Sequence, residues 1–244
     1  MRKQKKKENK YIKVGCCGFP TSREKYFKEF DVVEIQNTFY SIPSLENVKK
    51  LKEEALKINK NFEFCIKAFQ VITHKSISPT YKKLKEKFGN PLNYGSFQPT
   101  KEVFEAWEKT KEIAKILDTK IILFQTPASF TEEERNIKNI KEFFSSIKKE
   151  KFIFAWEARG WSEPKRKEVC EELKLISAVD PFKEKAFGGI NYFRLHGLPG
   201  YNLRYTYSNE DLEKLKSFCD KKQNYVFFNN LQMLKNAIEF KQIL

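Results

Sequence analysis

The stretch Ile121-Ile122-Leu123-Phe124-Gln125-Thr126 is apolar at its first four positions and polar at its last two. A short, continuous apolar run is typical of a strand that is buried on both faces of a sheet. It follows an amphipathic stretch of helix length, Lys101–Leu117, and Thr100 precedes that stretch as a suitable helix cap. This region therefore contains a helix–strand unit of the kind that builds parallel sheets.

The same alternation continues in both directions along the chain. Strands are expected at Tyr11–Cys16, Val32–Gln36, Phe62–Ala68, Ile121–Thr126, Phe152–Ala158, Leu175–Val179, Tyr192–His196 and Tyr225–Phe228. Helices are expected at Arg23–Phe30, Leu45–Asn59, Lys101–Leu117, Glu132–Lys149, Glu163–Leu173, Asn209–Asp220 and Leu231–Ile243, capped by Ser44, Thr100, Thr131, Ser162 and Ser208 where these precede them.

Eight strands with intervening helices in 244 residues predict an α/β fold, a TIM-like (β/α)8 barrel. The sixth unit is expected to be irregular, because Asp180–Gly189 is too short and too glycine-rich for a full helix. A doubly wound open sheet is the alternative. No glycine-rich phosphate loop follows the first strand, which weighs against it. We expect residues 1–10 to form a basic tail and residues 11–244 a single domain.

Composition and charge narrow the class of partner. Hydrophobic residues make up 40% of the chain, enough for a large core. The formal net charge is +15, of which residues 1–10 contribute +5, so the body of the chain is itself basic. A basic body favours anionic partners, although a solvated lysine- and glutamate-rich surface is equally compatible with it. The sequence has no membrane-spanning run and no signal peptide, so we expect a cytoplasmic protein with no membrane partner.

The cysteines indicate free thiols. There are five, without a C-x-x-C pair, so neither a disulfide framework nor a cysteine-rich zinc site is expected. Cys65, Cys170 and Cys219 are interpreted as buried thiols. Cys16 is expected to be a small residue that fills the barrel, with a reactive thiol as the alternative.

Polar residues interrupt the expected strands at their carboxyl ends. A strand buried in a parallel sheet should be apolar throughout, and barrel enzymes keep their sites at the carboxyl ends of the strands. Within the pairs Glu34/Gln36, Glu157/Arg159 and Arg194/His196, period-two spacing places both members on one strand face. The further polar residues at these ends are Lys67, Gln125, Asp180, Asn229 and Asn230.

These strand ends resemble the YecE-like family (domain of unknown function 72). The resemblance rests on these stretches: Val14-Gly15-Cys16-Cys17-Gly18-Phe19, Val33-Glu34-Ile35-Gln36-Asn37-Thr38-Phe39-Tyr40, Phe64-Cys65-Ile66-Lys67-Ala68 with His74, Leu123-Phe124-Gln125-Thr126-Pro127, Trp156-Glu157-Ala158-Arg159, Tyr192-Phe193-Arg194-Leu195-His196-Gly197 and Phe227-Phe228-Asn229-Asn230. The resemblance implies a TIM-like barrel and supplies no reaction. It adds Asn37, Tyr40 and His74 to the candidate binding residues. Where many members have Thr-Ser-Gly-Trp, this chain has Cys16-Cys17-Gly18-Phe19, which puts any hydroxyl role there in doubt.

Two functions remain open. The first is an enzyme, such as a hydrolase or phosphodiesterase, that acts on a phosphorylated or other anionic substrate. Glu34, Glu157 and His196 would be its catalytic residues, and Asn37, Tyr40, Lys67, His74, Gln125, Arg159, Asp180, Arg194, Asn229 and Asn230 would bind substrate. We expect Arg194 to anchor the anion with the outward side of its fork. The structural alternative is a salt-bridge network that plugs the barrel, with Glu34 and Glu157 against Arg159 and Arg194.

A divalent metal held by Glu34, Glu157 and Asp180 is compatible with this enzyme, because carboxylates suit magnesium or manganese. A zinc cluster is not expected, because the chain has only two histidines, His74 and His196. The cofactor and the oligomeric state stay undetermined at this stage.

The second function is nucleic-acid binding, with or without catalysis. The stretch from Lys75 to Lys87 holds five lysines around Tyr81 and should overhang the barrel mouth. It belongs to the long connection His74–Thr100, which we expect to form an ordered but mobile lid with a turn at Gly89-Asn90-Pro91. A solvated helix is the plain interpretation of these lysines.

Overall fold

The computed structural model describes residues 11–84, 88–147, 150–220 and 222–244. Eight parallel strands lie in the order β1-β8-β7-β6-β5-β4-β3-β2. They are β1 (Ile12–Cys16), β2 (Val32–Ile35), β3 (Glu63–Lys67), β4 (Ile121–Thr126), β5 (Ile153–Ala158), β6 (Ile176–Val179), β7 (Ile190–Leu195) and β8 (Gln223–Phe228). This order confirms the predicted TIM-like barrel, which is nearly closed, and each strand lies within about two residues of its predicted limits.

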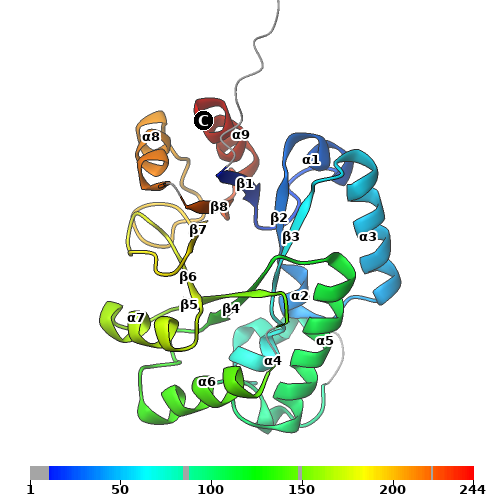
Figure 1. The fold of residues 1–244 in the computed structure, drawn as a ribbon, viewed down its shortest axis with the longest axis vertical. Coiled ribbons are helices and arrows are strands. Elements are labelled where there is room, and N and C mark those ends of the chain that lie inside the picture. The colour runs from blue at the N-terminus through cyan, green and yellow to red at the C-terminus, as the bar shows by residue number, and fades with distance from the viewer. Residues whose placement is uncertain (1–10, 85–87, 148–149, 221) are drawn as a thin grey trace, which may run out of the picture.

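Helices surround the strands (Figure 1). They are α1 (Arg23–Glu29), α2 (Asn37–Tyr40), α3 (Leu45–Ile58), α4 (Gln70–Thr73), α5 (Lys101–Leu117), α6 (Glu134–Ser146), α7 (Glu163–Glu172), α8 (Asn209–Phe218) and α9 (Met233–Ile243), with 3₁₀ turns η1 (Pro79–Lys83) and η2 (Pro91–Asn93). The side chains of Ser44, Thr100 and Ser208 cap their helices as predicted. Thr131 does not cap α6, which begins after Glu133, and the Ser162 side chain makes no capping bond.

The sixth unit lacks a helix, as predicted. Between β6 and β7 the chain makes an irregular turn, seen between α7 and α8 in Figure 1. Arg166 of α7, 1% exposed, holds this turn: its Nη1 lies 2.6 Å from Glu184 Oε2, and its Nη2 donates to the Lys185 carbonyl at 3.3 Å. An ion pair between a buried arginine and a partly exposed glutamate, together with a backbone bond, thus replaces the packing that a helix would supply.

Alternation along each strand separates two apolar layers. One layer packs against the helices and contains Val33, Ile66, Phe124, Trp156 and Phe228 among many others. The other fills the barrel interior with Val32, Cys65, Ile121, Leu123, Ala155, Ile176, Ala178, Tyr192, Tyr225, Phe227 and Cys17. Because the interior is filled in its middle, a site can form only at an end of the barrel.

The barrel closes between β1 and β2, where the ladder is reduced to one bridge. Cys17 pairs with Glu34, and the Gly18 amide donates to the Glu34 carbonyl at 2.9 Å. Gly15 lets the strands approach, since a Cβ at this position would lie 2.3 Å from the Val32 carbonyl oxygen. The close approach brings the end of β1 beside Glu34.

The hydroxyl of Tyr26 links β1 to β2 where the two strands lack ladder bonds. It accepts a hydrogen bond from the Cys16 amide at 2.7 Å and donates one to the Val32 carbonyl at 3.0 Å. Two buried backbone groups without a ladder partner are therefore satisfied by one side chain from α1.

Candidate functional site

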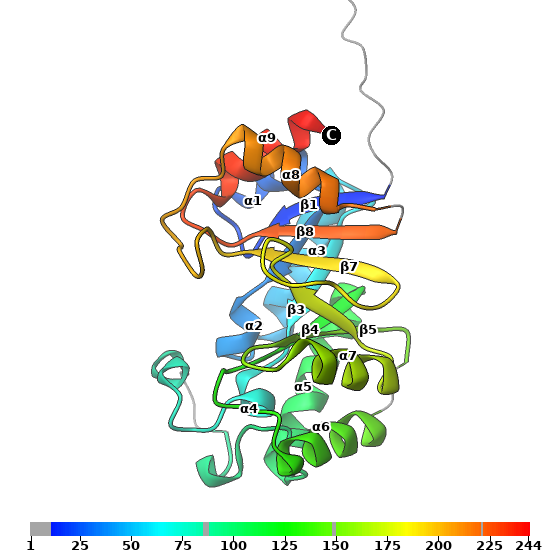
Figure 2. The same cartoon turned by 90° about the vertical axis from the view of Figure 1, so that its left-hand side faces the viewer.

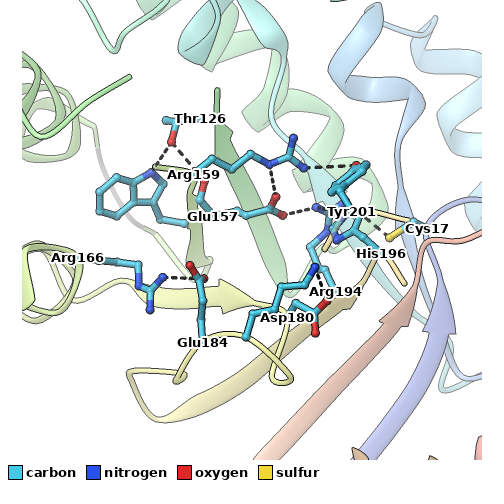
Figure 3. A network of polar contacts seen from close by, with 12 residues as sticks. Cys17, Thr126, Glu157, Arg159, Arg166, Asp180, Glu184, Arg194, His196 and Tyr201 are labelled. Atoms are coloured by element: carbon cyan, nitrogen blue, oxygen red, sulfur yellow. Dashed lines mark hydrogen bonds and ion pairs between the residues drawn. The ribbon is translucent and has the colours of Figure 1, made fainter. Parts of the chain in front are cut away.

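The inward-facing series of each strand becomes polar at the carboxyl end of the barrel. Successive inward positions lead to Glu34 on β2, Lys67 on β3, Gln125 on β4, Glu157 and Arg159 at the end of β5, Asp180 after β6, and Arg194 and His196 at the end of β7. The structure thus brings most of the predicted site residues to one mouth, and Figure 3 shows the central part of this network.

Arg194 is the centre of the network. It is 1% exposed, and it grips Glu34 through two parallel bonds of 3.0 Å, from Nε to Oε2 and from Nη2 to Oε1. Its Nη1 donates to Glu157 Oε2 and lies 3.5 Å from His196 Nε2. Nη2 also faces the Cys17 sulfur at 3.7 Å. Every nitrogen of the guanidinium thus has a protein partner.

This geometry corrects one expectation. The outward side of the Arg194 fork was expected to meet an anion, yet that side is occupied by Glu157, His196 and Cys17. Two carboxylates offset the cost of burying a permanent charge, so no ligand is needed to do so. Arg194 is placed to hold two glutamates in position.

Glu34 is equally enclosed. It is fully buried, and besides Arg194 it accepts hydrogen bonds from the Tyr192 hydroxyl at 2.7 Å, from Gln36 and from the Cys17 thiol at 3.3 Å. A carboxylate whose lone pairs are all engaged has no site left for a substrate proton. This surrounding favours a positioning role for Glu34 over the predicted catalytic one.

Glu157 lies nearer the opening. Its Oε1 accepts from Arg159 Nε at 2.8 Å, while Oε2 faces Arg194. Burial alone would raise the pKa of Glu157, but the charges of Arg194 and Arg159 outweigh it and hold that pKa well below its usual range. Glu157 is therefore ionised at neutral pH.

Arg159 and Tyr201 form the rim of the mouth. The Arg159 guanidinium lies 5.1 Å from the centroid of the Tyr201 ring, and its Nη2 is 3.5 Å from the Tyr201 hydroxyl. The same ring stacks on His196 at 4.5 Å. Arg159 keeps Nη1 without a partner among the described residues, and its side chain is 35% exposed.

Both histidines are neutral. Burial, reinforced by the nearby cations, lowers the pKa of His196 and of His74 to about 3. His74 Nδ1 lies 2.8 Å from the Thr73 hydroxyl, and its ring meets the edge of Phe39 at 4.9 Å. Neither imidazole carries a charge near pH 7, so each can offer only one N–H donor and one lone pair.

Lys67 differs from the other cations of the mouth. Its Nζ lies 3.6 Å from the centroid of the Phe39 ring. Within the described part of the chain its Nζ makes no ion pair and no hydrogen bond, although the side chain is only 5% exposed. Burial and the charge of Arg194 lower its pKa to about 7.

The short helix α2 explains how Lys67 is held. The Thr38 hydroxyl lies 2.7 Å from the Lys67 carbonyl and 3.1 Å from the Ile35 carbonyl, so it ties the end of β3 to the end of β2. The next residue, Phe39, then presents its ring to the lysine.

The remaining predicted residues are less central. Gln125 is buried beside Glu157 on the neighbouring strand, and its amide has no partner among the described residues. Asp180 pairs with Lys183 at 3.2 Å, and burial raises its pKa. Asn229 is half-buried after β8.

Three of the predicted residues lie outside the network around Arg194. The amide of Asn230 donates to the Tyr205 carbonyl at 2.8 Å and so fastens the loop after β7. The Tyr40 ring lies under Lys83, 4.5 Å from its Nζ. Asn37 is exposed and lines a cavity of about 370 Å³ beside α3.

The carboxylates do not form a metal site. No group of three or more His, Cys, Asp or Glu side chains placed to hold a metal occurs among the described residues. Glu34 and Glu157 face opposite sides of one arginine, and Asp180 turns to Lys183. The predicted triad is therefore not brought together.

The thiols next to the mouth are unreactive. Cys17, not Cys16, lines the barrel interior, whereas Cys16 packs outward, which corrects the expectation for Cys16. Burial raises the pKa of Cys17 well above its usual range and that of Cys16 to about 12. Both thiols stay protonated. Cys65 and Cys170 are buried as predicted, while Cys219 is only half-buried.

The connection between α4 and α5 lies on the carboxyl side of the barrel (Figure 2), which agrees with the predicted position. Asn90 caps η2 by accepting from the Leu92 amide at 3.1 Å, at the predicted turn. Lys85 and Lys87 lie outside the described residues. That this segment acts as a lid stays a prediction.

Three residues of the mouth were not predicted from the sequence: Tyr192, Phe39 and Tyr201. Tyr192 stands two positions before Arg194, so the period-two rule that paired Arg194 with His196 would have found it. Phe39 and Tyr201 come from a short helix and a loop, where no periodic signal exists.

Eight parallel strands with a charged carboxyl-end mouth place the chain among the TIM-like barrels. Within this class it belongs to the DUF72 family, described as a protein family of unknown function, whose profile matches residues 20–244. This confirms the resemblance drawn from the strand-end motifs. No curated protein matches the sequence significantly, and no helix among the described residues is long and apolar enough to cross a membrane.

Solved structures agree with this assignment. The DUF72 protein TM1631 from Thermotoga maritima is 22% identical, with a TM-score of 0.67 over 95% of this chain and 98% of that one. EF0366 from Enterococcus faecalis is 18% identical, with a TM-score of 0.72 over 97% and 98%. A D-psicose 3-epimerase shares the fold at 10% identity, with a TM-score of 0.54 over 95% and 96%.

Proposed function

We propose that this barrel is an enzyme that acts on a phosphorylated or other anionic substrate at its mouth. One observation carries the proposal. Arg194 and Arg159 together balance the charges of Glu34 and Glu157, so Lys67 is left without a carboxylate partner among the described residues, and Arg159 keeps N–H donors that no described carboxylate accepts. Spare guanidinium donors and an extra basic group at the carboxyl end of a barrel favour an anionic ligand.

Arg159 is the proposed anion contact. Its guanidinium is always charged, is partly exposed and keeps Nη1 free among the described residues, and a guanidinium fork suits phosphate oxygens. Tyr201 and the neutral His196 lie beside it and supply further donors. Glu157, ionised and bonded to Arg159, is proposed to orient that guanidinium toward the anion; its lowered pKa makes it a weak base.

Calorimetry with inorganic phosphate at low salt tests the anion site. Wild type should bind, and Arg159→Ala should bind at least about tenfold more weakly, because a charged hydrogen bond is lost. Lys82→Ala is the control, since Lys82 is exposed and forms no ion pair with a described residue. Equal binding by Arg159→Ala and wild type would refute the assignment.

Nucleic-acid binding is the second candidate. Lys75, Lys82 and Lys83 are exposed near the mouth, and no described carboxylate neutralises them. Tyr81, however, stacks on Tyr94 at 5.4 Å and donates to the His74 carbonyl, so it is not free to stack on a base. Salt-dependent binding of a single-stranded oligonucleotide that is lost in Lys82→Ala but kept in Arg159→Ala would favour this candidate.

A further inference from the structure

The mouth contains one amine that the charge network leaves aside. Lys67 ends β3 with its side chain among the inward-facing polar groups. Its Nζ lies 3.6 Å from the centroid of the Phe39 ring. The two glutamates that would be its natural partners are both held by Arg194. The Lys67 side chain is 5% exposed, so it is buried but not wholly closed off from solvent.

This environment makes the amine nucleophilic. Burial and the neighbouring guanidinium disfavour the ammonium form, and the pKa of Lys67 falls to about 7. About half of the molecules therefore carry a free amine at neutral pH, against roughly one in a thousand or fewer for an ordinary lysine. Enzymes that form covalent intermediates with carbonyl groups use lysines activated in this way.

We infer that Lys67 forms a Schiff base with the carbonyl carbon of an anionic aldehyde or ketone whose charged group lies on Arg159. The Lys67 nitrogen lone pair attacks the carbonyl carbon, and one N–H proton moves to the carbonyl oxygen to give a carbinolamine. A proton from solvent water adds to that hydroxyl, which leaves as water, and the nitrogen lone pair forms the C=N bond of a positively charged iminium that keeps the second N–H proton. The anionic half of this substrate rests on the proposed function.

The surroundings suit each stage of this step. The Gln125 side chain is 6% exposed, and its amide, which has no partner within the described ranges, can donate to the carbonyl oxygen. The positive iminium gains from the charges of Glu157 and Glu34, which already act on Lys67. Thr38 and Phe39 fix the lysine backbone and side chain, so that the nitrogen is positioned before the substrate arrives.

Borohydride trapping tests the inference. The full-length protein is incubated at neutral pH with dihydroxyacetone phosphate, reduced with sodium borohydride, and mapped by peptide mass spectrometry. One reduced adduct should appear on Lys67, favoured about a thousandfold over surface lysines by its free-amine fraction. Lys67→Met should show no adduct on that peptide, and Lys49→Met, at an exposed position of α3 away from the mouth, should label Lys67 as wild type does.

A pH series needs no variant and guards against misfolding. The labelling rate of Lys67 should rise with pH and level off above about pH 7, whereas surface lysines should keep gaining reactivity up to about pH 10. If Lys67 labels no faster than the surface lysines at neutral pH, the inference is overturned.

Neutral dihydroxyacetone separates the two proposals. If Arg159→Ala lowers labelling by the phosphate compound but not by dihydroxyacetone, both proposals are supported. If both compounds label Lys67 equally in wild type and Arg159→Ala, the Schiff base stands and the anion site fails. If phosphate binds by calorimetry but neither compound is reduced onto Lys67, the anion site stands and the Schiff base fails.

Discussion

The two ends of the barrel are both polar, yet they are balanced differently. At the amino end, Lys13 Nζ lies 2.6 Å from Glu63 Oε1, and the Tyr225 hydroxyl donates to Glu63 Oε2 at 2.7 Å. At the carboxyl end, Arg194 and Arg159 pair with the two glutamates, while Lys67 has no carboxylate partner in the part of the chain that the structure describes. Polar residues at a barrel end therefore do not by themselves indicate a binding site. A buried basic side chain without a carboxylate partner is the stronger indication.

The largest effect should come from breaking the centre of the carboxyl end. Arg194→Met leaves Glu34 and Glu157 buried without their partner, and we expect a loss of about 3–5 kcal/mol in the free energy of unfolding. Arg194→Lys should restore little of the lost free energy of unfolding, because an ammonium cannot form the two parallel bonds to Glu34. Urea denaturation measures both variants, and a loss below about 1 kcal/mol for Arg194→Met would contradict a tightly coupled network.

A pH-dependent effect, which over one pH unit is smaller than the loss in Arg194→Met, should come from Lys67. Its folded pKa is lowered from 10.5 to about 7. Between these values the unfolded chain binds a proton that the folded chain does not, so stability should rise with pH across this window. The wild-type free energy of unfolding, minus that of Lys67→Met, should increase by at most about 1.4 kcal/mol per pH unit there. A flat difference would mean that Lys67 keeps an ordinary pKa.

The smallest effect belongs to the amino end. The side chains of Lys13 and Glu63 remain 24% and 18% exposed, so water screens the pair. Glu63→Gln keeps an acceptor for Tyr225 and should cost about 1 kcal/mol or less in urea denaturation. A loss as large as that of Arg194→Met would show that the two ends do not differ in the way their charges are held.

Much of this arrangement follows from sequence. Apolar runs and caps such as Thr100 located the strands and helices, and period-two spacing placed Glu157 with Arg159 and Arg194 with His196 on one strand face. Parallel strands carry these ends to one mouth, so convergence needs no knowledge of exact registers. The α2 and α4 helices were missed because four residues are too few to show a helical period.

The strand ends named the groups that pair in the mouth, Glu34 and Glu157 with Arg159 and Arg194, but not how completely Arg194 would be enclosed. That enclosure includes Cys17, which the close approach of β1 and β2 brings beside Glu34. From the sequence, Arg194 was therefore predicted to anchor the ligand, and Lys67 was only one of several predicted binding residues. The low pKa of Lys67 arises from burial and from neighbours on other strands, neither of which a local pattern records.

Direct titration of Lys67 tests the central claim that the mouth holds an unpaired, activated amine. The lysine Cε and Nζ signals can be followed by NMR across pH in isotope-labelled protein, with Lys67→Arg used to identify the signal. We predict a midpoint at about 7 for Lys67, while the exposed lysines titrate at about 10.4. A Lys67 midpoint among those of the exposed lysines would contradict the account.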